Sequence, residues 1–226
     1  MSAIKAIFIK QLTDLPRNWS VFLLFVMWPL MAFVMGSLTG EAEVQTGMFV
    51  SMLIASGPMV SIANNVAEDN EYKGLRFLIM AGVKPWQYLI SMASAFILAS
   101  VVSLIALFWI GGFTGDILFR SSIAAALGLV TSALLGAAIG IFAKNVQQAT
   151  AVSTPLMMVL AFAPMVSMLN ETIARISEFL FSTQVLILVL DPNANFTRAL
   201  IIIMANAAIL LAFFVVAYKK KGLRGG

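Results

Sequence analysis

Residues 85–115 read PWQYLISMASAFILASVVSLIALFWIGGFTG, a stretch without a charged side chain that lies between Lys84 and Asp116. A helix needs about 20 apolar residues to cross the hydrocarbon core of a bilayer, so this stretch is long enough to span a membrane. A spanning segment must satisfy its own backbone hydrogen bonds, which leaves helices or closed barrels. Barrel strands alternate polar and apolar residues, and this stretch does not, so it predicts a transmembrane helix.

Other charge-free intervals of similar length share this character. They lie between Arg17 and Glu41, Glu43 and Glu68, Arg120 and Lys144, Lys144 and Glu171, and Arg198 and Lys219. Across the 226 residues, 61% are hydrophobic and only 11% are charged, unlike an average water-soluble domain. We therefore predict an all-α membrane protein with six transmembrane helices, built as a single transmembrane domain over residues 1–226.

A shorter apolar run precedes the last of these spans. Residues 179–190 are too few to cross a bilayer, and they end at Asp191 and Pro192. We expect this run to form a re-entrant or interfacial segment within an extracellular region over residues 169–197.

Basic residues indicate the orientation, because cytoplasmic loops of membrane proteins are enriched in Lys and Arg. With a cytoplasmic N-terminus, the basic residues on the inner side are Lys5, Lys10, Arg17, Lys73, Arg76, Lys84, Lys144, Lys219, Lys220, Lys221 and Arg224. Only Arg120, Arg175 and Arg198 then lie outside. The sequence therefore predicts a multi-pass protein of the cytoplasmic (inner or plasma) membrane with both termini inside. The net charge of +4 suits anionic lipid headgroups beside these spans, and we expect no nucleic-acid partner.

The N-terminal residues 1–16 have helical periodicity. Apolar residues recur at Ile4, Ile7, Phe8, Leu12 and Leu15, and Pro16 then interrupts the pattern. We expect an interfacial amphipathic helix that anchors the first span, with ligand binding as the alternative. The first span could also belong to a secretory signal, but it is longer than a usual signal core and no clean small-x-small cleavage site follows it.

Missing residue types exclude several chemistries. The chain has no Cys and no His, which excludes disulfides, thiolate or imidazole metal sites and Ser-His-Asp triads. No Lys is followed by Ser or Thr, so a Walker A loop for ATP is absent. We therefore expect that the chain is not itself an enzyme and binds neither a metal nor a cofactor of its own.

One loop on the inner side is substantial. Residues 67–86 read AEDNEYKGLRFLIMAGVKPW. On a single helix, Asp69, Lys73 and Arg76 would share a polar face, and Tyr72 and its helical neighbours an apolar face. Such a helix could lie with its apolar side on the membrane or dock on a partner protein.

The order of residues in this loop resembles a known family. Residues 71–78, EYKGLRFL, followed by residues 82–88, GVKPWQY, resemble the segment after the second span of ABC-2 type permeases. There a Glu-rich stretch leads into x-Thr-Leu-x-x-Leu, a small or Pro-containing turn and an aromatic residue that opens the third span. Gly74 stands where Thr is usual. The N-terminal helix, the six spans and the broken segment before the last one extend the resemblance to the whole chain.

The resemblance implies the permease subunit of an ATP-binding cassette exporter. Such permeases pair with a second copy or a paralogue and dock on two cytoplasmic ATPase subunits, which bind the ATP and Mg. The coupling residues implied in this chain are Glu68, Asp69, Glu71, Tyr72, Lys73, Leu75, Arg76 and Leu78. Of these, Tyr72, Leu75 and Leu78 would enter a groove on the ATPase. A second contact through Lys144, Gln147 and Gln148 is the alternative to an ordinary polar turn.

The resemblance also implies an extracellular gate. Glu171, Arg175 and Glu178 follow i, i+4, i+7 spacing and would line one stripe of a surface helix in this gate. The alternative is an interfacial helix that only caps the bundle.

Features inside the spans are less specific. Prolines at Ser56-Gly57-Pro58, Thr154-Pro155 and Pro164 should kink or interrupt spans two and five. Asn64, Asn65 and Asn206 would need hydrogen-bond partners from another helix. The Gly-x-x-x-Gly pairs Gly36/Gly40, Gly111/Gly115 and Gly136/Gly140 would permit close helix packing.

Two other functions compete with the exporter. A channel or secondary transporter would place ionisable residues inside its spans, and the six long spans have none. The other possibility is a membrane scaffold or enzyme, and the sequence shows no arrangement of catalytic residues. The apolar spans and small outer loops suit a hydrophobic or amphipathic cargo such as an antimicrobial peptide, a lipid or a drug.

Overall fold

The computed structural model of the chain describes residues 3–14 and 19–223, and these ranges contain helices and no strand. The helices are α1 (Ala3–Asp14), α2 (Trp19–Thr39), α3 (Ala42–Glu71), α4 (Gly74–Met80), α5 (Pro85–Ile110), α6 (Gly115–Phe142), α7 (Val146–Ser167), α8 (Glu171–Ser177), α9 (Phe181–Leu190) and α10 (Phe196–Leu223).

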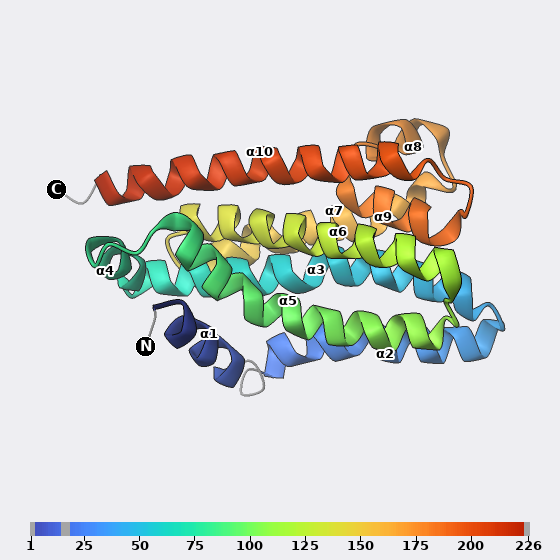
Figure 1. Cartoon of the computed structure of the whole chain (residues 1–226), viewed down its shortest axis with the longest axis horizontal. Coiled ribbons are helices and arrows are strands. Elements are labelled where there is room, and N and C mark those ends of the chain that lie inside the picture. The colour runs from blue at the N-terminus through green and yellow to red at the C-terminus, as the bar shows by residue number, and fades with distance from the viewer. Residues whose placement is uncertain (1–2, 15–18, 224–226) are drawn as a thin grey trace.

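Six of these helices, α2, α3, α5, α6, α7 and α10, are long and apolar enough to cross a membrane. Their axes run roughly along one direction, and α1, α4 and the C-terminal end of α10 lie toward the same end of the molecule (Figure 1). We call this the α4 end and the other the α9 end. The predicted all-α membrane fold with six spans is confirmed, and the chain is a multi-pass membrane protein.

Helix α3 forms the centre of the bundle. It packs against α2, α5, α6, α7 and α9. Of the residues in its most apolar 18-residue stretch, 83% are buried. Gly136 and Gly140 of α6 permit this packing, because a Cβ at Gly136 would lie 2.4 Å from the carbonyl oxygen of Met59. One of the predicted glycine pairs therefore lies at the main helix interface.

The intramembrane prolines do not interrupt their helices. Helix α3 continues through Pro58, and α7 continues through Pro155 and Pro164. Spans two and five are therefore not interrupted, and a kink at these prolines, the other predicted outcome, stays a prediction. A proline removes one backbone hydrogen bond and crowds the preceding turn, and transmembrane helices tolerate this where neighbouring groups satisfy the freed backbone.

Helices α8 and α9 form a bent pair with an angle of 112° between them. Helix α9 is buried along nearly its whole length and packs against α3, α6, α7 and α10. The pair lies at the α9 end (Figure 1). This geometry fits the predicted re-entrant segment, which stays a prediction.

A short N-terminal helix is present as predicted. Of the predicted interfacial segment 1–16, residues 3–14 are described and form α1, whereas 1–2 and 15–16 lie outside the described residues. Helix α1 packs against α5. Its place at the membrane interface stays a prediction.

Candidate functional site

The predicted coupling loop is built from three elements instead of one helix. Residues 67–71 belong to the end of α3, and α4 begins only at Gly74. Lys73 between them has φ of 59°, in the left-handed region that ends a helix. The expected helix that would place Asp69, Lys73 and Arg76 on one face is therefore wrong. Gly82, with φ of 80°, then helps turn the chain from α4 into α5.

Asp69 ties α3 to two other helices. The Tyr88 hydroxyl of α5 donates a 2.9 Å hydrogen bond to its Oδ2. The Lys10 ammonium of α1 lies 3.9 Å from its Oδ1. Tyr88 is fully buried, and only 19% of the Asp69 side chain is exposed. We call Asp69, Tyr88 and Lys10 the Asp69 cluster.

The last turn of α3 is also bonded to the turn between α6 and α7. The backbone N–H of Val146 donates to Oε2 of Glu71 at 3.2 Å. The Asn70 amide donates to the carbonyl oxygen of Ala143. Glu71 therefore stabilises the N-terminus of α7, where a carboxylate also meets the positive end of the helix dipole.

The turn after α4 is held by α10. The Tyr218 hydroxyl donates to the carbonyl oxygen of Val83 at 3.1 Å. The Tyr218 ring centre lies 5.9 Å from that of Tyr88. Sequence reasoning assigned no role to Tyr88 or Tyr218. Tyr88 closes the motif quoted above, but nothing in the sequence pairs it with Asp69.

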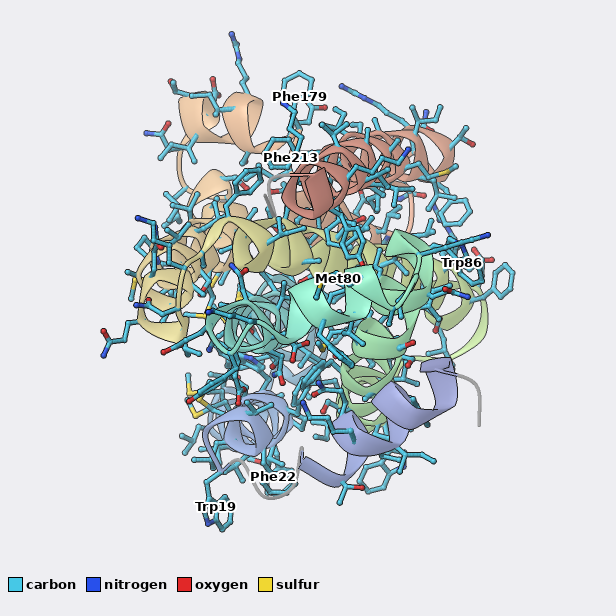
Figure 2. The ribbon with its side chains drawn as sticks, turned by 90° about the vertical axis from the view of Figure 1, so that its left-hand side faces the viewer. Trp19, Phe22, Met80, Trp86, Phe179 and Phe213 are labelled. Atoms are coloured by element: carbon cyan, nitrogen blue, oxygen red, sulfur yellow. The ribbon has the colours of Figure 1, made fainter. Side chains whose placement is uncertain are left out.

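Apolar side chains of this loop point away from the bundle. Tyr72, Phe77 and Met80 are 76%, 68% and 70% exposed, and we call them the exposed α4 surface. Met80 lies near the middle of the α4 end when that end faces the viewer (Figure 2). Sequence reasoning missed Phe77 and Met80, although their i, i+3 spacing places them on one side of a helix.

The other predicted coupling residues divide between the surface and the interior. Glu68, Lys73 and Glu71 are exposed, whereas Leu78 is half-buried and packs against the core. The side chains of Leu75 and Arg76 lie outside the described residues. Gln147, Gln148 and Lys144 are exposed at the adjacent turn, and their role as a second contact stays a prediction.

At the α9 end, the predicted gate residues are separated. Glu171 and Arg175 are exposed on α8. Glu178 follows α8 and forms an ion pair with Arg198 of α10. Arg120 of α6 is a further residue that sequence reasoning missed. It donates to the carbonyl oxygens of Pro192 and Ala194 and lies 5.4 Å from the centre of the Phe196 ring, so it holds the turn between α9 and α10.

Intramembrane asparagines serve packing. Asn64 accepts a 3.1 Å hydrogen bond from Thr150 of α7. Asn206 of α10 donates to the carbonyl oxygen of Phe179 at 3.0 Å. Asn65 instead donates to Ser61 within its own helix at 2.9 Å, so the expected partner from another helix is wrong for this residue.

Comparison with known proteins agrees with this arrangement. No curated protein matches the chain. A family model described as ABC-2 family transporter protein matches residues 42–219, which cover the helices from α3 to nearly the end of α10. Members of this family are membrane transport components, not ATPases, and generally work with a cytoplasmic ATPase subunit. The chain therefore belongs to the ABC-2 transporter family, as an ABC transporter permease that spans the membrane several times.

Proposed function

We propose that this permease is the membrane subunit of an exporter driven by a separate ATPase, which binds the ATP and Mg and docks on the exposed α4 surface. The observation that carries the proposal is the exposure of Tyr72 just before α4 and of Phe77 and Met80 on α4, a short helix whose flanking segments are fixed to the bundle by polar bonds. In this arrangement the α4 end is cytoplasmic, and the protein lies in the cytoplasmic membrane with both termini inside.

The exposed α4 surface has the chemistry of a docking site. Each Å² of apolar surface removed from water contributes roughly 25 cal/mol to the free energy of binding. Three large apolar side chains therefore favour burial in a groove on a partner protein. Exposed charges at Glu68 and Lys73 surround these side chains in the sequence and would select the partner and its orientation. Leu78 faces the core, which makes it a support for α4 and not a contact.

Movement of α4 would reach the rest of the bundle through the Asp69 cluster and Tyr218. The cluster joins α1 to the ends of α3 and α5 that flank α4, and the Tyr218 bond joins the turn after α4 to α10. Because α3 also packs against α9, closure of an ATPase pair would shift the bundle and the α8–α9 pair together. Glu171, Arg175 and Glu178 would then belong to an extracellular gate.

The assembly would contain two permeases, either two copies of this chain or one with a paralogue, and two ATPase subunits. Of the residues that the structure describes, none of the buried ones is charged. Such an interior suits a hydrophobic or amphipathic cargo, for instance an antimicrobial peptide, a lipid or a drug.

Co-purification in mild detergent tests the docking. We expect the wild-type chain to retain an ATPase subunit in roughly equal amount, and the triple variant Tyr72→Asp, Phe77→Asp and Met80→Asp to lose it. Leu169→Asp is the matched control, because Leu169 is 88% exposed in the loop between α7 and α8. The control should retain the ATPase. Equal retention by the triple variant would refute docking at this surface.

Reconstitution separates the exporter from the alternative channel or secondary transporter. Purified chain in vesicles without nucleotide or a second polypeptide should move no solute along an ion gradient. Gradient-driven movement under these conditions would favour the alternative.

A further inference from the structure

The buried start of α9 leaves hydrogen-bonding groups without partners. Phe181, Ser182 and Thr183 form its first turn and are at most 3% exposed. No side chain caps this turn, and the backbone N–H groups of these three residues meet no acceptor among the described residues. The hydroxyls of Ser182 and Thr183 are likewise buried and unpartnered in the described part of the chain. We call these three residues the α9 start.

Another unpartnered hydroxyl comes from the facing helix. The Ser121 hydroxyl of α6 lies 3.5 Å from the carbonyl oxygen of Leu188, and a Cβ at Gly128 would lie 3.1 Å from Val185. The two helices therefore run antiparallel. One further turn along each brings Ser132 of α6 to the level of Ser182. Ser132 is fully buried, and its hydroxyl also lacks a partner within the described ranges.

An apolar groove continues from this point toward the α4 end. It has a volume of about 280 Å³ and is lined by α6, α7 and α10, including Leu135, Ala138, Val152, Leu210 and Phe213. Leu135 lies one turn beyond Ser132. Leu210 lies one turn beyond Asn206, which donates to the carbonyl oxygen of Phe179 just before α9. By this helical spacing, the groove begins about one turn beyond the level of the α9 start.

The far end of this groove is bounded by two aromatic rings. Phe142 of α6 and Phe213 of α10 have ring centres 5.3 Å apart. Phe213 is 53% exposed, and Figure 2 labels it at α10 in the view of the α4 end. This end of the groove therefore lies at the exposed surface of the bundle, and the opposite end points toward the α9 start.

The electrostatics of the α9 start favour a negative partner. A helix N-terminus carries about half a positive charge, which resides on its unpaired first-turn N–H groups. Buried polar groups without a partner are costly, so a ligand that accepts their hydrogen bonds gains that free energy. None of the buried residues that the structure describes carries a carboxylate to do so.

We propose that the α9 start and the adjoining groove bind an amphipathic anion. Its carboxylate or phosphate oxygen accepts hydrogen bonds at the α9 start, and its apolar chain lies in the groove. The inference rests on the proposed transport function, because the α9 start is closed to solvent here and movement of α8 and α9 would give access to it. It narrows the cargo from any hydrophobic molecule to one with an anionic head.

Photolabelling of the purified full chain tests the site. The probe is decanoate with a diazirine near the end of its chain, added to the protein in phosphatidylcholine nanodiscs. We expect labelling at residues 135–142 and 210–213, suppressed by unlabelled decanoate and not by 1-decanol. The double variant Ser182→Ala and Thr183→Val should weaken labelling about tenfold or more, since it removes two donors to a charged group.

A groove variant gives a second measurement that leaves the α9 start intact. Ala138→Phe should block the chain and abolish labelling. Ser94→Phe is the matched control, because Ser94 lines a different apolar groove, between α5 and α6, and labelling should persist. Equal competition by 1-decanol, wild-type labelling of the double variant, or no labelling of the wild type would each overturn the proposal.

Lipid composition identifies the source of the anion. If phosphatidylglycerol in the nanodisc suppresses labelling, the site takes a lipid phosphate; if labelling persists, it takes a free carboxylate. The triple variant of the exposed α4 surface should label like the wild type. Retention of the ATPase by the triple variant, with intact labelling of the wild type, would therefore refute only the docking. Loss of the ATPase by the triple variant, with no labelling of the wild type, would refute only this inference.

Discussion

The hydroxyl of Tyr88 donates a 2.9 Å hydrogen bond to the carboxylate of Asp69, and this bond joins the end of α3 to the start of α5 on either side of α4. The two segments that flank α4 are thereby fixed to each other. The arrangement makes α4 part of the bundle and not a free loop.

Removing this bond should weaken the α4 end. We expect Tyr88→Phe to lower the free energy of unfolding by about 1–2 kcal/mol, because Asp69 loses a buried partner. Thermal unfolding in detergent measures the change. Tyr72→Phe is the control, since the Tyr72 side chain is 76% exposed, and it should leave stability unchanged. Equal stability of the two variants would contradict a structural role for the Asp69 cluster.

The hydrogen bond between Glu71 and Val146 leads to a second prediction about stability. Glu71→Ala removes the acceptor at the N-terminus of α7 and should lower the free energy of unfolding by about 0.5–1 kcal/mol. Glu71→Gln keeps an acceptor and should lose less, and its loss should shrink at high salt. Chemical denaturation at two salt concentrations measures both variants. A Gln variant as unstable as the Ala variant would show that the hydrogen bond contributes nothing.

Close packing of α3 and α6 predicts a strong effect at Gly136. A Cβ there would lie 2.4 Å from a backbone oxygen, so Gly136→Ala must push the two helices apart. We expect a loss of about 1–3 kcal/mol, the usual cost of overpacking. Gly74→Ala is the matched control, because its nearest neighbour would be 3.4 Å away. Unfolding curves that do not separate the two variants would contradict the tight interface.

The hydrogen bonds of Arg120 lead us to expect local opening at the α9 end when this residue is replaced. Arg120→Lys keeps the charge but lacks the planar fork that serves two carbonyl groups. Amide hydrogen exchange should therefore accelerate at residues 191–196 and stay unchanged in α4. An unchanged rate at residues 191–196 would show that other contacts hold this turn.

Much of the architecture could be predicted because long apolar intervals leave a chain little choice in a bilayer. The interval between Lys84 and Asp116 became α5, and the short run over residues 179–190 became the buried α9. The helix break at Lys73 was missed, because a left-handed residue that is not Gly leaves no clear local signal.

Contacts between distant residues explain the rest of the difference. A coupling role for Asp69 and Glu71 stays a prediction, but the hydrogen bonds that their carboxylates accept from α5 and α7 were not predicted. One sequence without alignment cannot reveal which polar groups meet after folding. The exposed α4 surface could have been found in part, since Phe77 and Met80 have i, i+3 spacing, which places them on one side of a helix.

Because α9 reaches only part of the way through the bundle, the cross-sectional area of the protein differs between the two leaflets. Around Val185 a transverse section of the bundle includes α9, and around Phe142 it does not. Lipid tails near one surface must therefore surround a wider object than those near the other. Any movement of α9 out of the bundle would reduce that difference, so the free-energy cost of such a movement would depend on the spontaneous curvature of the surrounding lipid.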